Sequence, residues 1–225
     1  MSVPTIRMSF VKAAIALLLI GLALHVGGAE ASSSVTTETA KEASATFESL
    51  SGGVRTSVVI TVAETEVASS AGVERGLHAD IEIFQADTRG GRNDRFIAVG
   101  GSVDTIRDGP AVIEDDLSKA ALEVSIPVCG AKPLHNGRLK QRPFLECFDV
   151  QIALEWTSTS EIYSDSGTDD YPLGDCTVHV FSSYTLNAAS SAGTIMAGGI
   201  NFAGSPSARA SLGASNRSVT ATCPD

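Results

Sequence analysis

The sequence predicts an all-β protein, an antiparallel β-sandwich of about eight strands that follows an N-terminal signal peptide. The main observation is an alternation of apolar and polar residues with a period of two, which recurs along several runs after residue 57. Clusters of Gly, Asn, Asp, Ser and Pro separate these runs at spacings typical of a β-sandwich. No long stretch after the N-terminal apolar segment has the periodicity of a helix.

The N-terminal segment has the three parts of a secretory signal peptide. Arg7 and Lys12 make its start positive, residues 13–24 form an uninterrupted apolar run, and small residues occupy the −3 and −1 positions of a cut after Ala31. We therefore expect residues 1–31 to be removed on export. The alternative is an uncleaved N-terminal anchor, for which the apolar run falls short of the roughly 20 residues that a membrane-spanning helix needs.

The charge of the chain limits its partners. The whole chain has a net charge of −10, and loss of the signal peptide would remove two positive charges and one negative charge, leaving −11. Nucleic acids and anionic membranes are polyanions that bind faces rich in Lys and Arg, so neither is an expected partner. No later segment is long and apolar enough to span a bilayer. We expect a secreted or cell-surface protein with an extracellular or cell-surface partner.

The first segment of the mature chain has the composition of a linker. Residues 32–51 are rich in Ser, Thr, Ala and Glu, which predicts a flexible, exposed N-terminal segment. Within it, the spacing of Ala40, Ala43, Phe47 and Leu50 would allow one short amphipathic helix.

The β domain is expected over residues 52–225. Its clearest strand is residues 148–156, where apolar residues from Phe148 to Trp156 alternate with polar ones, so that Trp156 is expected in the core. The other predicted strands lie in residues 58–63, 80–83, 96–103, 122–128, 177–181, 194–202 and 217–222.

An internal duplication is a second interpretation of these runs. Residues 52–132 and 144–225 contain similar motifs in the same order at offsets of 92 to 98 residues, for example Gly100-Gly101 and Gly198-Gly199. The alternative is that amphipathic strands resemble one another in any β protein. A true duplication requires the two halves to match strand for strand.

All four cysteines lie in the exported part of the chain. An even number of cysteines in an oxidising compartment predicts two disulfides. Cys129 ends one alternating run and Cys147 begins the next, so antiparallel pairing of the two strands would bring them together. Elimination then pairs Cys176 with Cys223.

The strongest candidate site is the stretch YSDSGTDDYPLGD, residues 163–175. Its glycines and proline are typical of a long turn, so we expect an acidic connector between two strands. A calcium site is the alternative, although the spacing does not match the pattern D-x-[DN]-x-[DN]-G. The candidate ligands are Asp165, Asp169, Asp170 and Asp175 for calcium, with Tyr163 and Tyr171 as platforms for a sugar ring.

The sequence assigns no catalytic residue. It lacks the GxSxG, HExxH, GxxxxGK[ST] and GxGxxG motifs, and no spacing ties a histidine to a nucleophile. Neighbouring carboxylates would suit glycoside hydrolysis, but strand ends and turns commonly carry such residues in acidic exported proteins. The residues weighed here are His78, His135 and His179 and the carboxylate pairs Glu64 with Glu66 and Asp115 with Asp116.

These observations favour an exported module with a non-enzymatic binding or structural role. Two alternatives remain: a secreted hydrolase whose carboxylates and histidines meet only in the fold, and a calcium-stabilised carbohydrate-binding module. No cofactor other than this calcium ion is expected.

Overall fold

The structure is a computed structural model that describes residues 33–87, 96–104, 111–129, 131–133, 139–141, 147–203 and 206–224. The expected signal peptide and its cleavage site lie outside these residues. The described residues form strands and no helix, which confirms the expected all-β class. No helix able to cross a membrane occurs in this part of the chain.

Twelve strands are present in the described residues. Eight of them have nine or more residues, close to the number that the sequence predicts. They are β1 (Ser33–Ser51), β2 (Val54–Ser69), β3 (Gly72–Asp87), β4 (Phe96–Asp104), β5 (Ala111–Ile113), β6 (Lys119–Cys129), β7 (Ala131–Pro133), β8 (Leu139–Gln141), β9 (Cys147–Leu173), β10 (Cys176–Ala197), β11 (Ile200–Asn201) and β12 (Arg209–Thr222).

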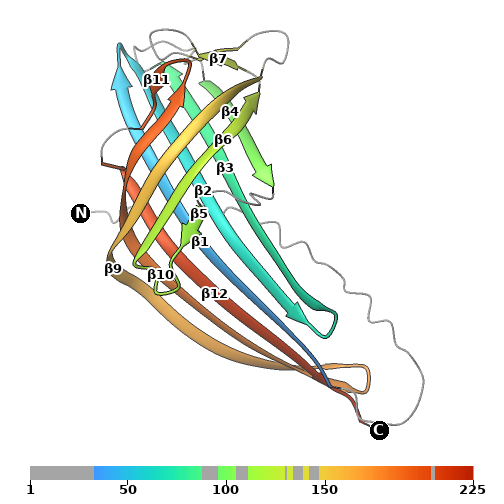
Figure 1. Cartoon of the computed structure of the whole chain (residues 1–225). Helices are drawn as coiled ribbons and strands as arrows, with labels where there is room; N and C mark the ends of the chain where they lie inside the picture. Colours follow the sequence, from blue (N-terminus) through green and yellow to red (C-terminus); the bar gives the residue numbers. More distant parts are fainter. Residues whose placement is uncertain are drawn as a thin grey trace. The chain divides into compact units, whose positions relative to one another are not determined.

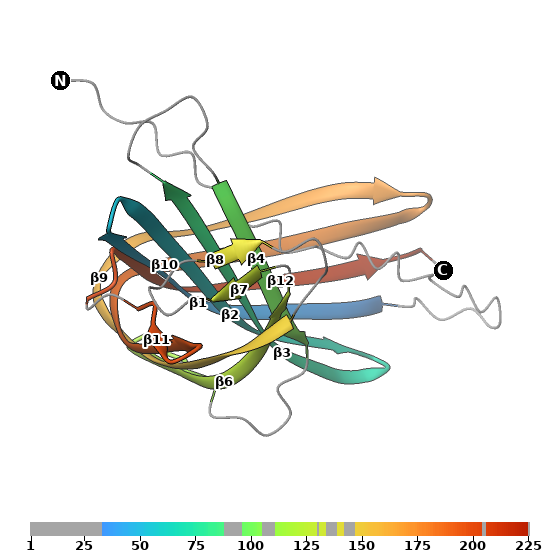
Figure 2. The same cartoon turned by 90° about the horizontal axis from the view of Figure 1, so that it is seen from above.

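Ten of these strands belong to one antiparallel sheet, and β7 and β8 form a separate pair (Figure 1). The sheet order is β11-β10-β12-β1-β2-β3-β4-β6-β5, and β9 pairs with both β10 and β6, so the sheet closes on itself (Figure 2). The link between β4 and β6 is a single residue pair, Gly100 with Cys129. The two separate sheets of a sandwich are not confirmed. Long strands twist and coil, which allows one sheet to enclose its own core.

The core lies inside the closed part of the sheet. The predicted alternation along β9 is confirmed, because apolar side chains from Val150 to Trp156 are buried while Asp149 and Gln151 are exposed. Trp156 is 1% exposed and donates its Nε1–H to the carbonyl oxygen of Ser44 on β1 at 2.9 Å. The other largest fully buried side chains include Phe47, Ile60, Ile81, Ile83, Leu122 and Ile126. Each such residue stabilises the fold by about 1.5–3 kcal/mol.

The sequence predicts a linker over residues 32–51, but the structure has strand β1 there. It lies between β12 and β2 and pairs with both along most of its length. Ala43, Ala45 and Phe47 point into the core at a period of two, so the helical spacing of the apolar residues does not decide the structure. Backbone hydrogen bonds to two neighbours stabilise this strand, which needs only three apolar side chains.

The internal duplication is not confirmed. Gly100 and Gly101 lie within β4, whereas Gly198 and Gly199 have φ angles of 57° and 79° and form the turn between β10 and β11. The two halves therefore do not match strand for strand at this motif.

Both predicted disulfides are present. Cys129 pairs with Cys147 across β6 and β9, with Cα atoms 4.0 Å apart, and Cys176 pairs with Cys223 at 4.1 Å. The second bridge joins the start of β10 to the residue after β12. Two disulfides are consistent with an extracellular protein.

Six strands continue beyond the closed part of the sheet. β6 pairs with β9 only as far as Thr157, and β4 pairs with β3 only from His78 onwards. Past these positions β9, β10, β12, β1, β2 and β3 form an open extension in which most side chains are partly or fully exposed (Figure 2). The turn after β5 lies at the boundary, where Leu117 is 4% exposed and completes the base of the core.

Candidate binding surface on the β9–β10 hairpin

The acidic stretch at residues 163–175 is mostly strand, which corrects the expectation of a loop. β9 runs to Leu173, and a two-residue turn at Gly174 and Asp175 leads directly into β10. Gly174 has a φ of 64°, which suits the first central position of a tight hairpin turn. We call residues 158–189 the β9–β10 hairpin. Its β9 half is an edge strand exposed on both faces, so it needs no apolar alternation and gives no strand signal.

The strand geometry separates the aspartates that the sequence groups together. Successive side chains of a strand point to opposite faces. One face of the β9 half carries Tyr163, Asp165, Asp169 and Tyr171. Asp170 lies on the other face, and Asp175 lies in the turn. No group of three or more His, Cys, Asp or Glu suited to a metal ion occurs among the described residues.

The face that carries Asp170 has a shallow depression of about 300 Å³, and we call it the hydroxyl face. Along the same strands, this face continues into the face that points to the core in the closed part of the sheet. Two rows of directly opposed residues cross from β9 through β10 to β12. The rows are Thr168, Phe181 and Ser218, and Asp170, His179 and Thr220.

A hydrogen-bonded His–Asp pair and an aromatic ring distinguish this depression from the surrounding sheet. His179 Nδ1 lies 2.7 Å from Asp170 Oδ1, and both side chains are more than half exposed. The Phe181 side chain is 41% exposed in the adjacent row. The next row of the same face contains only short polar side chains, Ser166, Ser183 and Asn216.

The opposite face, the tyrosine face, carries all three tyrosines of the chain. The Tyr163 and Tyr184 rings are tilted at 44° with centroids 6.3 Å apart, a favourable aromatic geometry. The Tyr163 hydroxyl donates a hydrogen bond of 2.6 Å to Asp165. This bond lowers the pKa of Asp165 and raises the pKa of Tyr163. Tyr171 lies further along β9 on the same face.

Tyr184 extends the tyrosine face across the neighbouring strands. Its hydroxyl oxygen lies 3.4 Å from where a Cβ on Gly213 would be, so a glycine on β12 leaves room for it. Burial raises the pKa of Tyr184, and the negative charge of Glu42 on β1 raises it further. Burial also raises the pKa of Glu42, partly offset by His78 on β3. His78 Nε2 itself lies 3.7 Å from Asp80 Oδ2, so this histidine, one of the three weighed in the sequence, contacts a partly exposed carboxylate.

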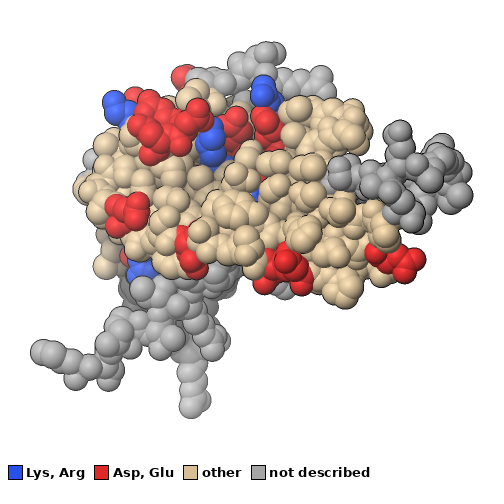
Figure 3. All heavy atoms as spheres, turned by 90° about the horizontal axis from the view of Figure 1, so that it is seen from below, with Lys and Arg blue, Asp and Glu red and all other residues tan. Residues whose placement is uncertain are grey.

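The hairpin belongs to an acid-only segment of the sequence. No lysine or arginine occurs between Arg142 and Arg209, whereas eight Asp and Glu residues do. On the face of the molecule that Figure 3 draws, acidic side chains also cover more of the surface than lysine and arginine. The local field therefore attracts cations and repels anions.

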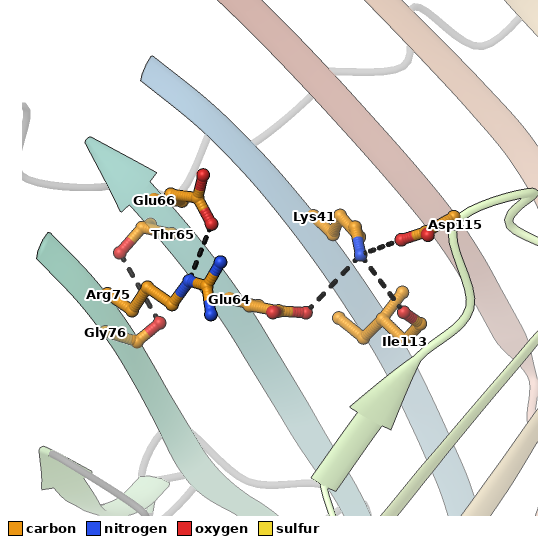
Figure 4. Close-up of polar contacts among 8 residues, drawn as sticks. All are labelled: Lys41, Glu64, Thr65, Glu66, Arg75, Gly76, Ile113 and Asp115. Carbon is orange, nitrogen blue, oxygen red and sulfur yellow. Dashed lines mark hydrogen bonds and ion pairs between the residues drawn. The ribbon is translucent and has the colours of Figure 1, made fainter. Parts of the chain in front are cut away.

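The carboxylate pairs considered for hydrolysis have structural roles at the base of the open extension (Figure 4). Arg75 Nε lies 2.7 Å from Glu66, and Lys41 Nζ lies 3.6 Å from Glu64. Lys41 also donates hydrogen bonds to Asp115 and, at 3.4 Å, to the carbonyl oxygen of Ile113. The bond to Asp115 is the main cause of a raised pKa at Lys41.

The remaining member of these pairs, Asp116, accepts the backbone N–H of Ser118 at 2.9 Å, which lowers its pKa. Three of the four carboxylates thus form ion pairs and the fourth stabilises a turn. His135 lies outside the described residues.

The free edge of β9 is protected against pairing with another strand. Over residues 158–173 it pairs only with β10 among the described residues. Register shifts occur opposite Leu186/Asn187 and Ala188/Ala189 on β10, and Pro172 lacks an N–H donor. Irregular pairing, proline and charge are features that prevent edge-to-edge association, so the two faces are better candidates for binding than the edge.

Sequence reasoning missed Phe181 and Tyr184 as surface residues. The alternation over residues 177–181 already places Phe181 among the polar positions of its strand, together with His179. A large apolar residue on a polar face was the available signal. The pairing of His179 with Asp170 has no such signal, because it depends on the register between two strands.

No family model matches the chain, and neither the curated protein sequences nor the solved structures contain a match to it. The geometry of the chain itself therefore carries the functional argument.

Proposed function

We propose that the protein is an exported, non-enzymatic binding module that contacts its partner through the faces of the β9–β10 hairpin. One observation carries this proposal. Six of the ten exposed large hydrophobic side chains among the described residues lie on this hairpin: Ile162, Tyr163, Tyr171, Leu173, Phe181 and Tyr184.

The hairpin adds little to the core, because most of its side chains are exposed. The aromatic side chains among them are 39–48% exposed, so each forgoes part of the roughly 1.5–3 kcal/mol that full burial would contribute. Concentrated apolar surface of this kind is typical of an interaction site. The disulfide at Cys176 and Cys223 supports this role, because it fixes the free end of the hairpin to β12.

Export through a cleaved signal peptide is part of the proposal. Strand β1 begins at Ser33, so a cut after Ala31 would leave the described sheet intact. N-terminal sequencing of the protein from the culture medium should start at Ser32. Recovery of the full-length chain only from membranes would instead support an uncleaved anchor and overturn this part of the proposal.

Binding can be tested with defined probes: neutral oligosaccharides, oligogalacturonate, a lysine-rich peptide, a glutamate-rich peptide, and the protein itself by sedimentation. We expect at least one probe to bind the mature protein and to lose most of its affinity in the double variant Y171S/F181S, which alters one residue on each face. L50S/V112S is the matched control, since it removes two exposed apolar side chains outside the hairpin.

Two results would overturn the proposal. One is the absence of binding to every probe. The other is equal binding by both double variants. Steady hydrolysis of an oligosaccharide would favour the secreted hydrolase instead.

A further inference from the structure

The depression on the hydroxyl face combines three kinds of chemistry within two adjacent rows. Phe181 presents an apolar ring that is 41% exposed. Asp170 and His179 form a hydrogen-bonded polar pair at 2.7 Å. Thr168, Ser218 and Thr220 supply hydroxyl groups at the other positions.

The polar pair is suited to contact a ligand that both donates and accepts hydrogen bonds. When His179 donates from Nδ1 to Asp170 Oδ1, its Nε2 is an acceptor that this bond does not use. The second carboxylate oxygen of Asp170 is likewise not part of this bond. The three hydroxyl groups can each donate and accept by rotation. The His179–Asp170 pair therefore offers mainly hydrogen-bond acceptors, and hydroxyl groups that can donate or accept surround it.

This combination matches the chemistry of a sugar ring. A pyranose has an apolar face of C–H groups that stacks on an aromatic ring, and its hydroxyl groups donate to carboxylate and imidazole acceptors. The next row of this face, Ser166, Ser183 and Asn216, has only short polar side chains, so adjacent sugar units can lie over it. Neighbouring residues within a row are one strand spacing, about 4.8 Å, apart, and the two rows are two residues, about 6.8 Å, apart along the strands.

Charge narrows the class of sugar further. No lysine or arginine lines the depression in the described structure, and the hairpin carries only acidic formal charges at neutral pH. Uronic acids and sulfated sugars would be repelled, whereas neutral and amino sugars would not.

We propose that this depression binds a carbohydrate without acidic groups, with Phe181 as the stacking platform and Asp170 as the main acceptor. The inference rests on the proposed binding function of the hairpin and assigns a ligand class and a face to it. A cationic peptide is the competing ligand, because it could pair with the second carboxylate oxygen of Asp170, but it would leave the hydroxyl groups of Thr168, Ser218 and Thr220 unused.

Binding to cellohexaose, mannohexaose, xylohexaose, chitohexaose and its deacetylated form can be measured by isothermal titration calorimetry, with oligogalacturonate as the acidic probe. At least one non-acidic oligosaccharide should bind, and oligogalacturonate should not. F181S and D170N should each weaken binding by about tenfold or more, which corresponds to about 1.4 kcal/mol.

The same hairpin offers matched controls on its opposite face. Tyr171 is 44% exposed, close to the value for Phe181, and Asp169 is the chain neighbour of Asp170. Y171S and D169N should change the affinity for the sugar by less than twofold. Retained fluorescence of the buried Trp156 should show that all four variants are folded.

The outcomes separate this inference from the proposed function. Binding of a hexalysine peptide, but of no sugar, would overturn the inference and retain the hairpin as a binding surface. Binding of a sugar that Y171S and D169N weaken as much as F181S and D170N would also overturn the assigned face. Absence of binding to any sugar or peptide, together with no self-association, would overturn both proposals.

Discussion

The disulfide between Cys176 and Cys223 should stabilise the protein more than the disulfide between Cys129 and Cys147. The two bridges close loops of very different length, with sequence separations of 47 and 18 residues. Loop-closure entropy in the unfolded chain then gives about 4 kcal/mol for the longer loop and about 3 kcal/mol for the shorter one. The total stability of a domain this size is about 5–15 kcal/mol, so either loss is measurable.

The perturbation is the replacement of each pair by serine, as C176S/C223S and C129S/C147S. Urea unfolding followed by far-UV circular dichroism and by fluorescence of Trp156, the single tryptophan, gives the free energy of unfolding for each variant. Trp156 is 1% exposed in the closed part of the sheet, so its signal reports loss of the core. A loss below about 1 kcal/mol for C176S/C223S, or a larger loss for C129S/C147S, would refute the reasoning.

Three further changes test the described contacts. Gly193→Ala should destabilise the protein by about 3 kcal/mol or more in thermal melts. A Cβ at Gly193 would lie 2.1 Å from the backbone oxygen of Ala153, and the φ of Gly193 is 141°. The control Gly167→Ala meets nothing within 4 Å and should be tolerated. Glu42→Gln should stabilise by only ~0.5 kcal/mol at pH 7, since water reaches much of this side chain. Burial raises the pKa of Glu42, so the wild-type protein is stabilised below the ordinary pKa of this group and loses that stability as pH rises. The gain from Glu42→Gln should therefore vanish near pH 3, where Glu42 is also neutral. A gain that persists at pH 3 would contradict this account. Lys41→Met should cost about 1 kcal/mol at pH 7. Because the pKa of Lys41 is raised, that difference should persist up to pH 10.5 and disappear only above it. It should also fall below about pH 4, where the partner carboxylates are protonated. A pH-independent difference would exclude the ion pairs as its cause.

Local periodicity was sufficient to predict the strands that have one face in the core. The alternation from Phe148 to Trp156 predicts both the strand and its buried face, and both are confirmed. The disulfides were predictable for a related reason, since Cys129 and Cys147 end adjacent strands that the sequence already indicates.

Local periodicity failed where a strand has no buried face or few large apolar residues. β1 was predicted as a linker because Ser, Thr, Ala and Glu dominate it, and the second half of β9 was predicted as a loop because it is acidic and contains glycine and proline. Both are strands because distant partners satisfy their backbone hydrogen bonds, and the composition of a segment does not report such partners.

The candidate site depends on the same distant pairing. The sequence by itself determined the all-β class, the acidic charge, the disulfide pairs and the presence of tyrosines and aspartates in one short stretch. Only the tertiary structure decided that this stretch is a strand, which divides Asp169 from Asp170 and places Phe181 and His179 beside the latter. The physical reason is that a strand alternates its side chains between two faces, and the register with β10 and β12 determines which side chains share a face.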